Sequence, residues 1–350
     1  MGTIISHCWF ASERSDAPFT TRRVATKRSD TPLSTKKELR TAIEDYFYGL
    51  REGKTDISNW DTSKITDMSH IFKNTPKLSD EPITLNWDTS NVTNMSWMFE
   101  CCHQDFILNF RRHSGGSCHT ATADHSAVGN ECLKEFSPTG ENVQKALCNT
   151  GNVTNMSYMF YGAKNFNQPL HFDTSNVTNM SRMFYDATSF NQPLNFNTSN
   201  VTNMSFMFYH AISFNKLLQI NTHNVTNMSW MFAYATSFNQ PLNFNTSNVT
   251  TMSCMFNHAT HFNQPLLFDT SNVKTIECMF YDAFSFNQPI YFQSCNKDFY
   301  ENIFKNSPMN GQETKYVLKP VFYSKLVLFY MLNQITPELP YLCDEFEEFF

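Results

Sequence analysis

Residues 190–213 read FNQPLNFNTSNVTNMSFMFYHAIS, and this stretch decides the fold because the chain repeats it with a period of 24. Six contiguous copies run from residue 153 to residue 292 without an insertion. Self-similarity at a fixed period indicates a repeat architecture, in which each unit packs against its neighbours and is not stable alone. The recurring positions are Phe166, Phe190, Phe214, Phe238, Phe262 and Phe286; Val153, Val177, Val201, Val225, Val249 and Val273; Phe160, Phe184, Phe208, Phe232, Phe256 and Phe280; Met156, Met180, Met204, Met228 and Met252, followed by Ile276; and Ala163, Ala187, Ala211, Ala235, Ala259 and Ala283.

The array continues beyond its last regular copy. Ile303 and Phe304 stand one full period after Met279 and Phe280, which indicates one further, decayed unit. We therefore assign residues 151–306 to a contiguous repeat array.

Earlier copies precede this array. Residues 60–72 read WDTSKITDMSHIF and residues 87–99 read WDTSNVTNMSWMF, so the same segment recurs at a spacing of 27. The pattern begins again at residues 106–110 and then stops. Residues 57–110 therefore form a first group of repeats. An irregular insert with three cysteines and three histidines, residues 111–150, separates the two groups and is expected to leave the coil as a loop.

The unit length predicts the fold class. Twenty-four residues are too few for two packed helices and lie within the range of leucine-rich repeats. The segments FNQPLNF and NVTNM read as short strands, and MFYxAxS reads as a short 3₁₀ or helical connector. The apolar positions outnumber those of one sheet face, so they are expected to point into the axis of a coil. The sequence therefore predicts a mainly β chain, an LRR-like β-solenoid of tandem 24-residue turns.

The repeats also resemble a known family. The units NVTNMSYMFYGAKNFNQPL, DTSNVTNMSRMFYDATSFNQPL and WDTSNVTNMSWMFE are similar to those of the BspA-like leucine-rich-repeat surface proteins, over residues 57–110 and 153–304. TKKELRTAIEDYFYGLREGKTDISNWDTS, residues 35–63, resembles the segment that precedes such arrays. The resemblance implies a solenoid that binds other proteins at a cell surface and performs no catalysis.

Capping structure is expected at both ends, because a bare solenoid end exposes apolar core and strand edges. Residues 34–56 are assigned to a capping helix that runs over residues 35–52 and ends at Gly53. Thr35 and Glu38 have the form of a capping box. The apolar positions that follow at helical spacing are Leu39, Ala42, Ile43, Tyr46, Phe47 and Leu50.

The two terminal segments differ from the repeats and from each other. Residues 1–33 have no apolar period and are predicted to be disordered. Residues 307–350 are expected to form a helical, apolar C-terminal cap and an acidic tail. Their apolar stretch, Val321–Ile335, is shorter than the ~20 residues of a membrane span and reads as a buried helix.

Location and membrane association stay open. No basic residue precedes the apolar start MGTIISHCWF, which predicts no cleavable signal peptide and favours an intracellular location. The family resemblance implies the cell surface instead. MGTIIS also fits the short pattern for N-myristoylation at Gly2.

Composition excludes several classes of partner and cofactor. The 26 basic and 32 acidic residues give a formal net charge of −6, which predicts no nucleic-acid partner. Cys101, Cys102 and His103 with Cys118, His119 and His125 carry zinc-type ligands, but their spacing matches no regular zinc module. We therefore predict no metal, no cofactor and incidental thiols.

One column of the repeat is a candidate interaction site. Tyr158, Arg182, Phe206 and Trp230 follow one another at the repeat period, and Cys254 and Cys278 continue the same column. Because side chains this different are accepted there, the column is expected to be exposed and to form a contact strip. The alternative is that side chains one turn apart simply cover each other.

Asn-x-Ser/Thr occurs in almost every turn. As glycan acceptors these asparagines would decorate the whole array. The interpretation that we prefer is a hydrogen-bonded amide ladder that satisfies backbone groups at a tight corner. The asparagines concerned are Asn91, Asn94, Asn152, Asn155, Asn176, Asn179, Asn197, Asn200, Asn203, Asn224, Asn227, Asn245 and Asn248.

Catalytic chemistry is not evident in the repeats. Only nine charged residues lie between residues 153 and 292, and Asp173 and Asp269 share a column four turns apart. Asp and Asn alternate at that column, as expected of a corner cap. The sequence thus predicts no catalytic residues and a non-enzymatic module for protein–protein interaction or adhesion, whose protein partner it does not identify. Alternatives are an intracellular scaffold without one fixed partner and, more remotely, a carbohydrate-active solenoid enzyme.

Overall fold

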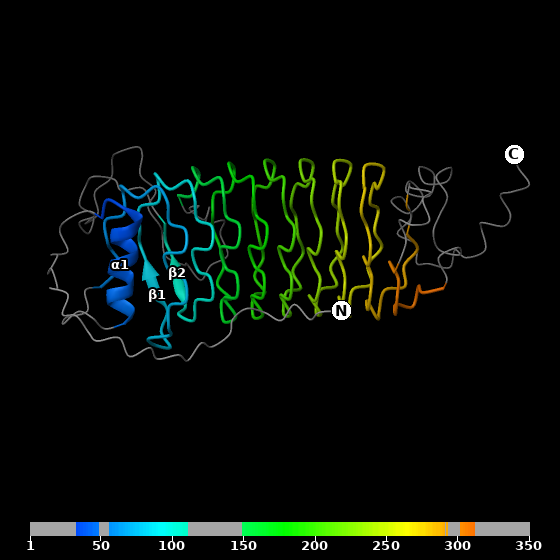
Figure 1. Ribbon diagram of the computed structural model, residues 1–350, viewed down its shortest axis with the longest axis horizontal. Helices are drawn as coiled ribbons and strands as arrows, with labels where there is room; N and C mark the ends of the chain where they lie inside the picture. The colour runs from blue at the N-terminus through cyan, green and yellow to red at the C-terminus, as the bar shows by residue number, and fades with distance from the viewer. Residues whose placement is uncertain (1–32, 49–55, 111–148, 291, 293–301, 312–350) are drawn as a thin grey trace, which may run out of the picture.

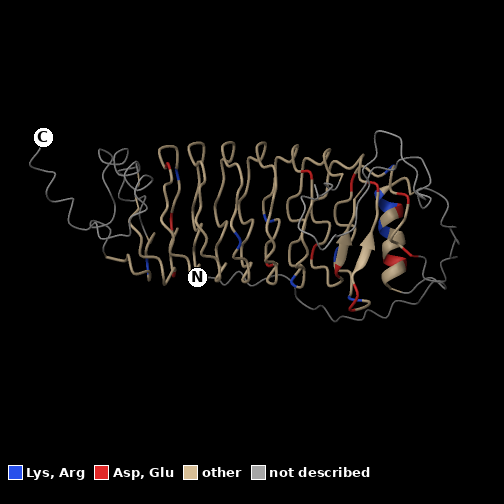
Figure 2. Cartoon of the chain, turned by 180° about the vertical axis from the view of Figure 1, so that it is seen from behind, with Lys and Arg blue, Asp and Glu red and all other residues tan. Residues whose placement is uncertain are grey.

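The computed structural model describes residues 33–48, 56–110, 149–290, 292 and 302–311. In this part of the chain the repeats form a row of turns that lie side by side, with one helix at the end of the row (Figure 1). Charged residues are concentrated near that helix and are sparse along the row (Figure 2). Regular secondary structure in the described residues consists of α1 (Lys36–Phe47), β1 (Ile83–Leu85) and β2 (Phe106–Leu108).

Helix α1 begins at the predicted capping box. The Thr35 hydroxyl accepts a hydrogen bond of 3.2 Å from the backbone N–H of Glu38. The Glu38 carboxylate accepts from the N–H of Ser34 at 3.0 Å, so the reciprocal bond is displaced by one residue from the predicted pattern. The apolar face of α1 is buried, whereas Leu50 and Gly53 lie outside the described residues. The buried residues of this face are Leu39, Ala42, Ile43 and Phe47.

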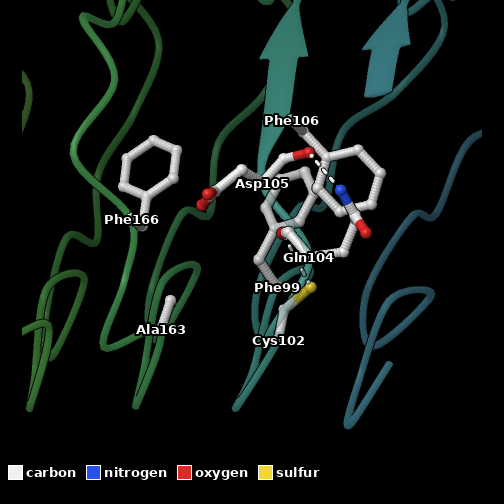
Figure 3. Close-up of a pocket in the computed structure, with 7 residues that line it drawn as sticks. All are labelled: Phe99, Cys102, Gln104, Asp105, Phe106, Ala163 and Phe166. Carbon is white, nitrogen blue, oxygen red and sulfur yellow. Dashed lines mark hydrogen bonds between the residues drawn. The ribbon is translucent and has the colours of Figure 1, made fainter. Parts of the chain in front are cut away.

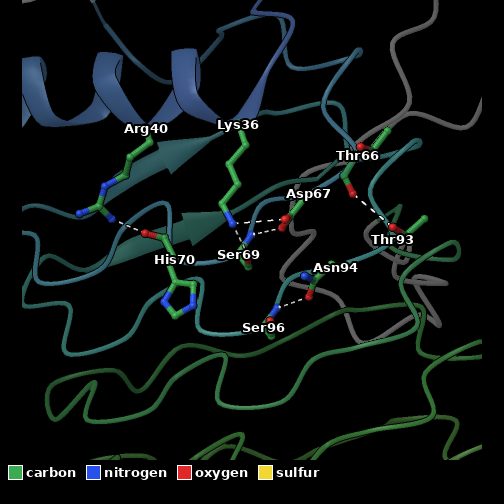
Figure 4. Close-up of polar contacts among 9 residues, drawn as sticks. All are labelled: Lys36, Arg40, Thr66, Asp67, Ser69, His70, Thr93, Asn94 and Ser96. Carbon is green, nitrogen blue, oxygen red and sulfur yellow. Dashed lines mark hydrogen bonds and ion pairs between the residues drawn. The ribbon is translucent and has the colours of Figure 1, made fainter.

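Helix α1 covers the first turn and satisfies its backbone (Figure 4). The Lys36 ammonium forms an ion pair of 3.2 Å with Asp67 and a hydrogen bond with Ser69. The Arg40 guanidinium donates to the carbonyl oxygen of His70. It also donates to the carbonyl oxygen of Lys73 at 3.3 Å. The equivalent carbonyl of the next turn, that of Glu100, accepts from the N–H of Asn74 in the preceding turn, and the first turn has no such turn before it. The polar side of α1 therefore replaces a missing neighbour.

Strands β1 and β2 form a two-stranded parallel sheet in which Ile83 lies opposite Phe106. The loop with the three extra residues of the 27-residue unit is held by the buried Gln104. The side-chain oxygen of Gln104 accepts from the N–H of Leu78 at 2.9 Å, and its nitrogen donates to the carbonyl of Glu81 at 3.1 Å. One buried amide thus closes the longer loop.

The turns on either side of residues 111–148 pack directly against each other. The N–H of Met95 donates to the carbonyl of Asn155 at 3.0 Å, and the rings of Phe99 and Phe160 stack with centroids 5.3 Å apart. The two groups of repeats therefore meet directly, while the predicted loop itself, residues 111–148, lies outside the described residues. Successive turns are joined by single parallel bridges between Asp67, Asn94, Asn155, Asn179, Asn203, Asn227, Thr251 and Thr275, in that order.

The predicted apolar columns form the core. Phe184 is fully buried, and its ring stacks on that of Phe208 at 5.6 Å in the next turn and on Phe190 at 4.1 Å in its own turn. The decayed unit continues this stack, because the rings of Phe280 and Phe304 lie 5.5 Å apart. Since each ring buries its faces against two neighbours, removal of one turn exposes apolar surface on both sides.

One corner of each turn is capped by the alternating Asp and Asn column. Oδ1 of Asp173 accepts from the N–H of Ser175 at 3.0 Å, and Oδ1 of Asn197 accepts from that of Ser199 at 3.1 Å. Either side chain supplies the required acceptor, which confirms the corner-cap interpretation. The threonine that follows is buried and donates its hydroxyl to the next turn, as Thr198 does to the carbonyl of Asn221 at 2.7 Å.

A second asparagine makes the predicted amide ladder. Its side-chain N–H donates to a backbone carbonyl of the preceding turn, at 2.6 to 2.7 Å. The ladder interpretation is thereby confirmed for this column. The donors, each with its acceptor, are Asn91 with Ser63, Asn152 with Ser90, Asn176 with Gly151, Asn200 with Ser175, Asn224 with Ser199, Asn248 with His223 and Asn272 with Ser247.

The repeats contain less strand than the sequence predicts. Within residues 153–290 the turns are joined mainly by isolated bridging residues, one per turn with Phe172 and Ile290 as additional ones, and FNQPLNF carries no continuous backbone ladder. Pro193 has no N–H to donate, and the N–H of Asn191 is satisfied by the side chain of Asn167 at 2.9 Å instead. The MFYxAxS segment is a series of tight hydrogen-bonded turns rather than a 3₁₀ helix.

Candidate interaction surface

The outward-facing side chains of each turn are set by left-handed backbone. The N–H groups of Arg182 and Asp186 donate to the next turn, at Ser205 and Tyr209, whereas the N–H of Tyr185 donates back to Arg182 within its own turn. This alternation requires two residues per turn with φ between 48° and 66°. The first column of such residues is His70, Trp97, Tyr158, Arg182, Phe206, Trp230, Cys254, Cys278 and Asn302; the second is Asn74, Cys101, Gly162, Asp186, His210, Tyr234, His258, Asp282 and Asn306.

The predicted contact column is therefore the first left-handed column. Left-handed backbone costs an L-residue about 1–2 kcal/mol, so the bonds between turns must impose it. Sequence periodicity gave no sign of this conformation, because the usual markers, Gly and Asn, are rare in the column.

The side chains of this column are half-buried and stack on one another. The guanidinium carbon of Arg182 lies 5.1 Å from the ring centroid of Tyr158 and 4.2 Å from that of Phe206. The rings of Phe206 and Trp230 are 5.7 Å apart and nearly parallel. Upstream, Trp97 stacks on Tyr158 at 3.6 Å. The side chains thus cover each other by their faces while remaining partly exposed to solvent.

A tyrosine column runs beside it and was not singled out from the sequence, although it has the same 24-residue period. Tyr161 and Tyr185 stack at 4.6 Å, and Tyr185 and Tyr209 stack at 4.4 Å. Burial raises the pKa of Tyr185 and of Tyr209, so both hydroxyls stay protonated at neutral pH. The two columns together make a surface that we call the aromatic strip: Trp97, Tyr158, Tyr161, Arg182, Tyr185, Phe206, Tyr209 and Trp230.

The second left-handed column carries polar contacts to carboxylates that the sequence analysis did not identify. Asp186 is buried, and its carboxylate lies 2.5 Å from Nδ1 of His210 and 3.6 Å from Nζ of Lys164. Two turns further on, Nε2 of His258 lies 2.9 Å from the Asp282 carboxylate. Burial lowers the pKa of His258, and the nearby Asp282 opposes that shift. These contacts therefore join neighbouring turns along the second left-handed column.

The cysteines at the end of the first column are thiols. Cys254 is buried and Cys278 is half-buried, and neither forms a disulfide. Burial raises the pKa of Cys254 to about 12, and the Cys278 thiol adds to the effect. Cys254 and Cys278 therefore belong to the first left-handed column but, having no rings, not to the aromatic strip.

The Cys101–His103 segment is used for packing. Cys102 lines a small hollow with Phe99, Gln104 and Phe106 (Figure 3), and its sulfur lies 2.8 Å from the Thr75 hydroxyl. Burial raises the pKa of Cys102 to about 12, which disfavours the thiolate that a metal requires. The described residues contain no group of three or more His, Cys, Asp or Glu side chains that could hold a metal ion.

Several predictions lie outside the described residues. They concern the predicted disorder of residues 1–33 and the Gly2 pattern, the insert with Cys118, His119 and His125, and the predicted C-terminal cap with Val321–Ile335. Within the described part, no helix has both the length and the apolar character that crossing a bilayer demands.

Comparison with known proteins places the repeats in one family. The family model described as "Mycoplasma protein of unknown function, DUF285" matches residues 41–110, 132–220 and 216–316, well over half of the chain. Comparison with the curated proteins and with the solved structures gives no match. The matched segments cover the repeats on both sides of the insert, and the chain therefore belongs to this family of repeat proteins of unknown function.

Proposed function

We propose that this chain is a non-enzymatic module for protein–protein interaction or adhesion, built on an LRR-like β-solenoid of the BspA-like type. The observation that carries the proposal is the aromatic strip. Its half-buried rings and Arg182 run across successive turns on one continuous surface.

The solenoid part of the proposal is supported by the contacts between turns. Single parallel bridges and stacked phenylalanines recur at each 24-residue step, and both point along the row rather than across it. Stacked repeats of this kind produce an extended surface whose side chains vary from turn to turn.

The composition of the strip supports binding to a protein. Trp, Tyr and Arg are the residues that most often dominate the binding energy of protein interfaces. Aromatic side chains also lose little conformational entropy on binding, because two χ angles describe them. The rings of the strip are already fixed by stacking, so a partner would meet a surface that is largely ordered beforehand.

The acidic side chains of the array support a structural role. Asp173 and Asp269 are occupied as corner caps, and Asp186 and Asp282 are paired with His210 and His258. Each of these carboxylates therefore has a structural partner, which leaves little for the general acid and base work of a glycosidase.

The test compares partner capture by three versions of the full chain in the cells that make it. Phe206→Asn with Trp230→Asn removes two rings of the strip and suits left-handed backbone, since Asn302 occupies the equivalent place in a later turn. The control, Leu217→Asn with Leu267→Asn, alters two exposed apolar residues in other columns. Chemical cross-linking and quantitative mass spectrometry then identify bound proteins.

We expect at least one partner to be lost from the strip variant, by about tenfold or more, and retained by the control. Equal capture by all three versions would contradict the strip as the interaction surface and favour a scaffold without one fixed partner.

A further inference from the structure

The rings of the aromatic strip offer their edges, rather than their faces, to a binding partner. Trp97 and Tyr158, Tyr161 and Tyr185, and Phe206 and Trp230 are each stacked nearly parallel. Stacking covers the negative faces of the rings, so the positively polarised edges are the part of each ring that remains accessible. Such edges favour negative oxygens and the faces of other aromatic rings.

Arg182 adds the one positive charge of the strip. Its guanidinium plane is held between Tyr158 and Phe206, so its faces are covered while its in-plane N–H donors remain. Among the described residues, no carboxylate lies within ion-pair distance of Arg182, whereas Asp186 nearby is taken by His210 and Lys164. The strip therefore suits an occupant that brings carboxylates and aromatic rings together.

One segment of this chain has that composition. Residues 344–350 read DEFEEFF, four carboxylates and three phenylalanines in a single short run. We propose that this acidic, aromatic segment binds to the aromatic strip of the same molecule, with a carboxylate on Arg182 and phenylalanine faces against the ring edges.

The connecting chain is long enough for this contact. Residues 312–343 lie between the last described residue, Gly311, and the segment. Fully extended, they span on the order of 100 Å. Along the first left-handed column, Trp230 lies three turns before Asn302 and Trp97 lies seven. At about 4.8 Å per turn, the strip therefore begins roughly 15 Å and ends roughly 35 Å from Asn302.

The inference rests on the proposed function of the same strip and adds an intramolecular occupant, which a partner protein would have to displace. The test places the photo-reactive amino acid benzoylphenylalanine at position 346 of the full chain. After illumination, mass spectrometry maps the cross-linked peptides. A control chain carries the same group at Phe284, which is exposed on the array.

We expect cross-links from position 346 to peptides that contain Tyr158, Arg182, Phe206 or Trp230. Neutralising the segment with Asp344→Asn, Glu345→Gln, Glu347→Gln and Glu348→Gln, which leaves the repeats untouched, should lower the yield about fivefold, as should Arg182→Gln. Added salt should weaken the contact because exposed charges are screened. Cross-links elsewhere, or a yield that ignores the neutralised segment, would overturn the inference.

Mixing with an equal amount of isotope-labelled chain without the photo-reactive group separates the two possible sources. Products within one light chain support intramolecular binding, whereas light–heavy products would show a second copy and overturn it. Loss of an external partner in the strip variant without any such cross-link would reject this inference alone. Cross-links to the strip together with unchanged partner capture would reject the proposed function alone.

Discussion

The backbone N–H of Asn149 donates a hydrogen bond of 2.9 Å to the carbonyl oxygen of Phe110, although the whole of residues 111–148 separates them in the chain. In an uninterrupted unit the equivalent residues, Phe172 and Asp173, are covalent neighbours. The Phe110 ring stacks on that of Phe172 at 6.1 Å, as expected within a column. In space the turn therefore continues directly from Phe110 to Asn149, and residues 111–148 are inserted into the sequence of one regular turn.

Deletion of residues 111–148, with Phe110 joined to Asn149, should leave the array folded. The ends already lie within hydrogen-bond distance, and each halving of a loop lowers its closure cost by only about 0.6 kcal/mol. We expect a urea unfolding midpoint equal to or slightly above that of the full chain. A loss of the cooperative transition would show that the insert holds the two groups of repeats together.

Substitution by Asp should affect the stability of the array differently at two asparagines of one turn. Asn197 acts as an acceptor, and Asp occupies its column elsewhere, so Asn197→Asp should change the free energy of unfolding by less than about 0.5 kcal/mol. Asn200 donates its side-chain N–H to the carbonyl of Ser175 at 2.7 Å, and a carboxylate cannot. Asn200→Asp should therefore destabilise by about 1–2 kcal/mol. Urea denaturation of both variants measures the difference, and equal effects would contradict the assigned roles.

Gly162 should not tolerate a methyl group. Its φ is +66°, and a Cβ there would lie 2.8 Å from Sγ of Cys101 in the preceding turn. Gly162→Ala should lower the free energy of unfolding by about 1–3 kcal/mol, since it adds left-handed strain to a steric clash. Cys101→Ala in the same chain removes the sulfur and should recover the part due to the clash. A double-mutant cycle measures that coupling, and strict additivity would exclude the contact.

Two buried thiols should resist alkylation. Burial raises the pKa of Cys102 and of Cys254 to about 12, against an ordinary value of 9.0. At pH 8.5 such a shift lowers the thiolate fraction by about a thousandfold, so iodoacetamide should label both far more slowly than the half-buried Cys278. Peptide mass spectrometry after timed quenching measures the rates. Comparable rates at all three thiols would contradict the assigned burial.

The same shifts predict a loss of stability at alkaline pH. A raised pKa in the folded state means that the unfolded chain releases its proton first, so the contribution of each thiol is complete below pH 9 and is lost as the pH rises towards 12. The slope of the urea midpoint between pH 9 and 10.5 should become shallower in Cys102→Ala. An unchanged slope would mean that Cys102 is not the group responsible.

Local chemistry explains which features were predictable from the sequence. The corner caps at Asp173 and Asn197 use a side-chain acceptor two residues from its donor, so composition and spacing suffice to predict them. The capping box at Thr35 is local in the same way. The strands were overestimated because FNQPLNF satisfies its backbone through side chains such as Asn167, which β propensity does not describe.

The sequence by itself determined the 24-residue period, the phenylalanine and methionine columns of the core and the place where the insert interrupts them. The period also singled out the column of Tyr158, Arg182, Phe206 and Trp230, but its backbone conformation, its stacking and the tyrosine column beside it became visible in the folded chain alone. Tyr158, Arg182 and Phe206 adopt left-handed backbone because the N–H groups of one turn must reach the carbonyls of the next, and their rings stack because the turns are held that close. Left-handed backbone is unfavourable for such residues on their own and is imposed by hydrogen bonds to the neighbouring turns. The aromatic strip therefore forms only when the turns are assembled.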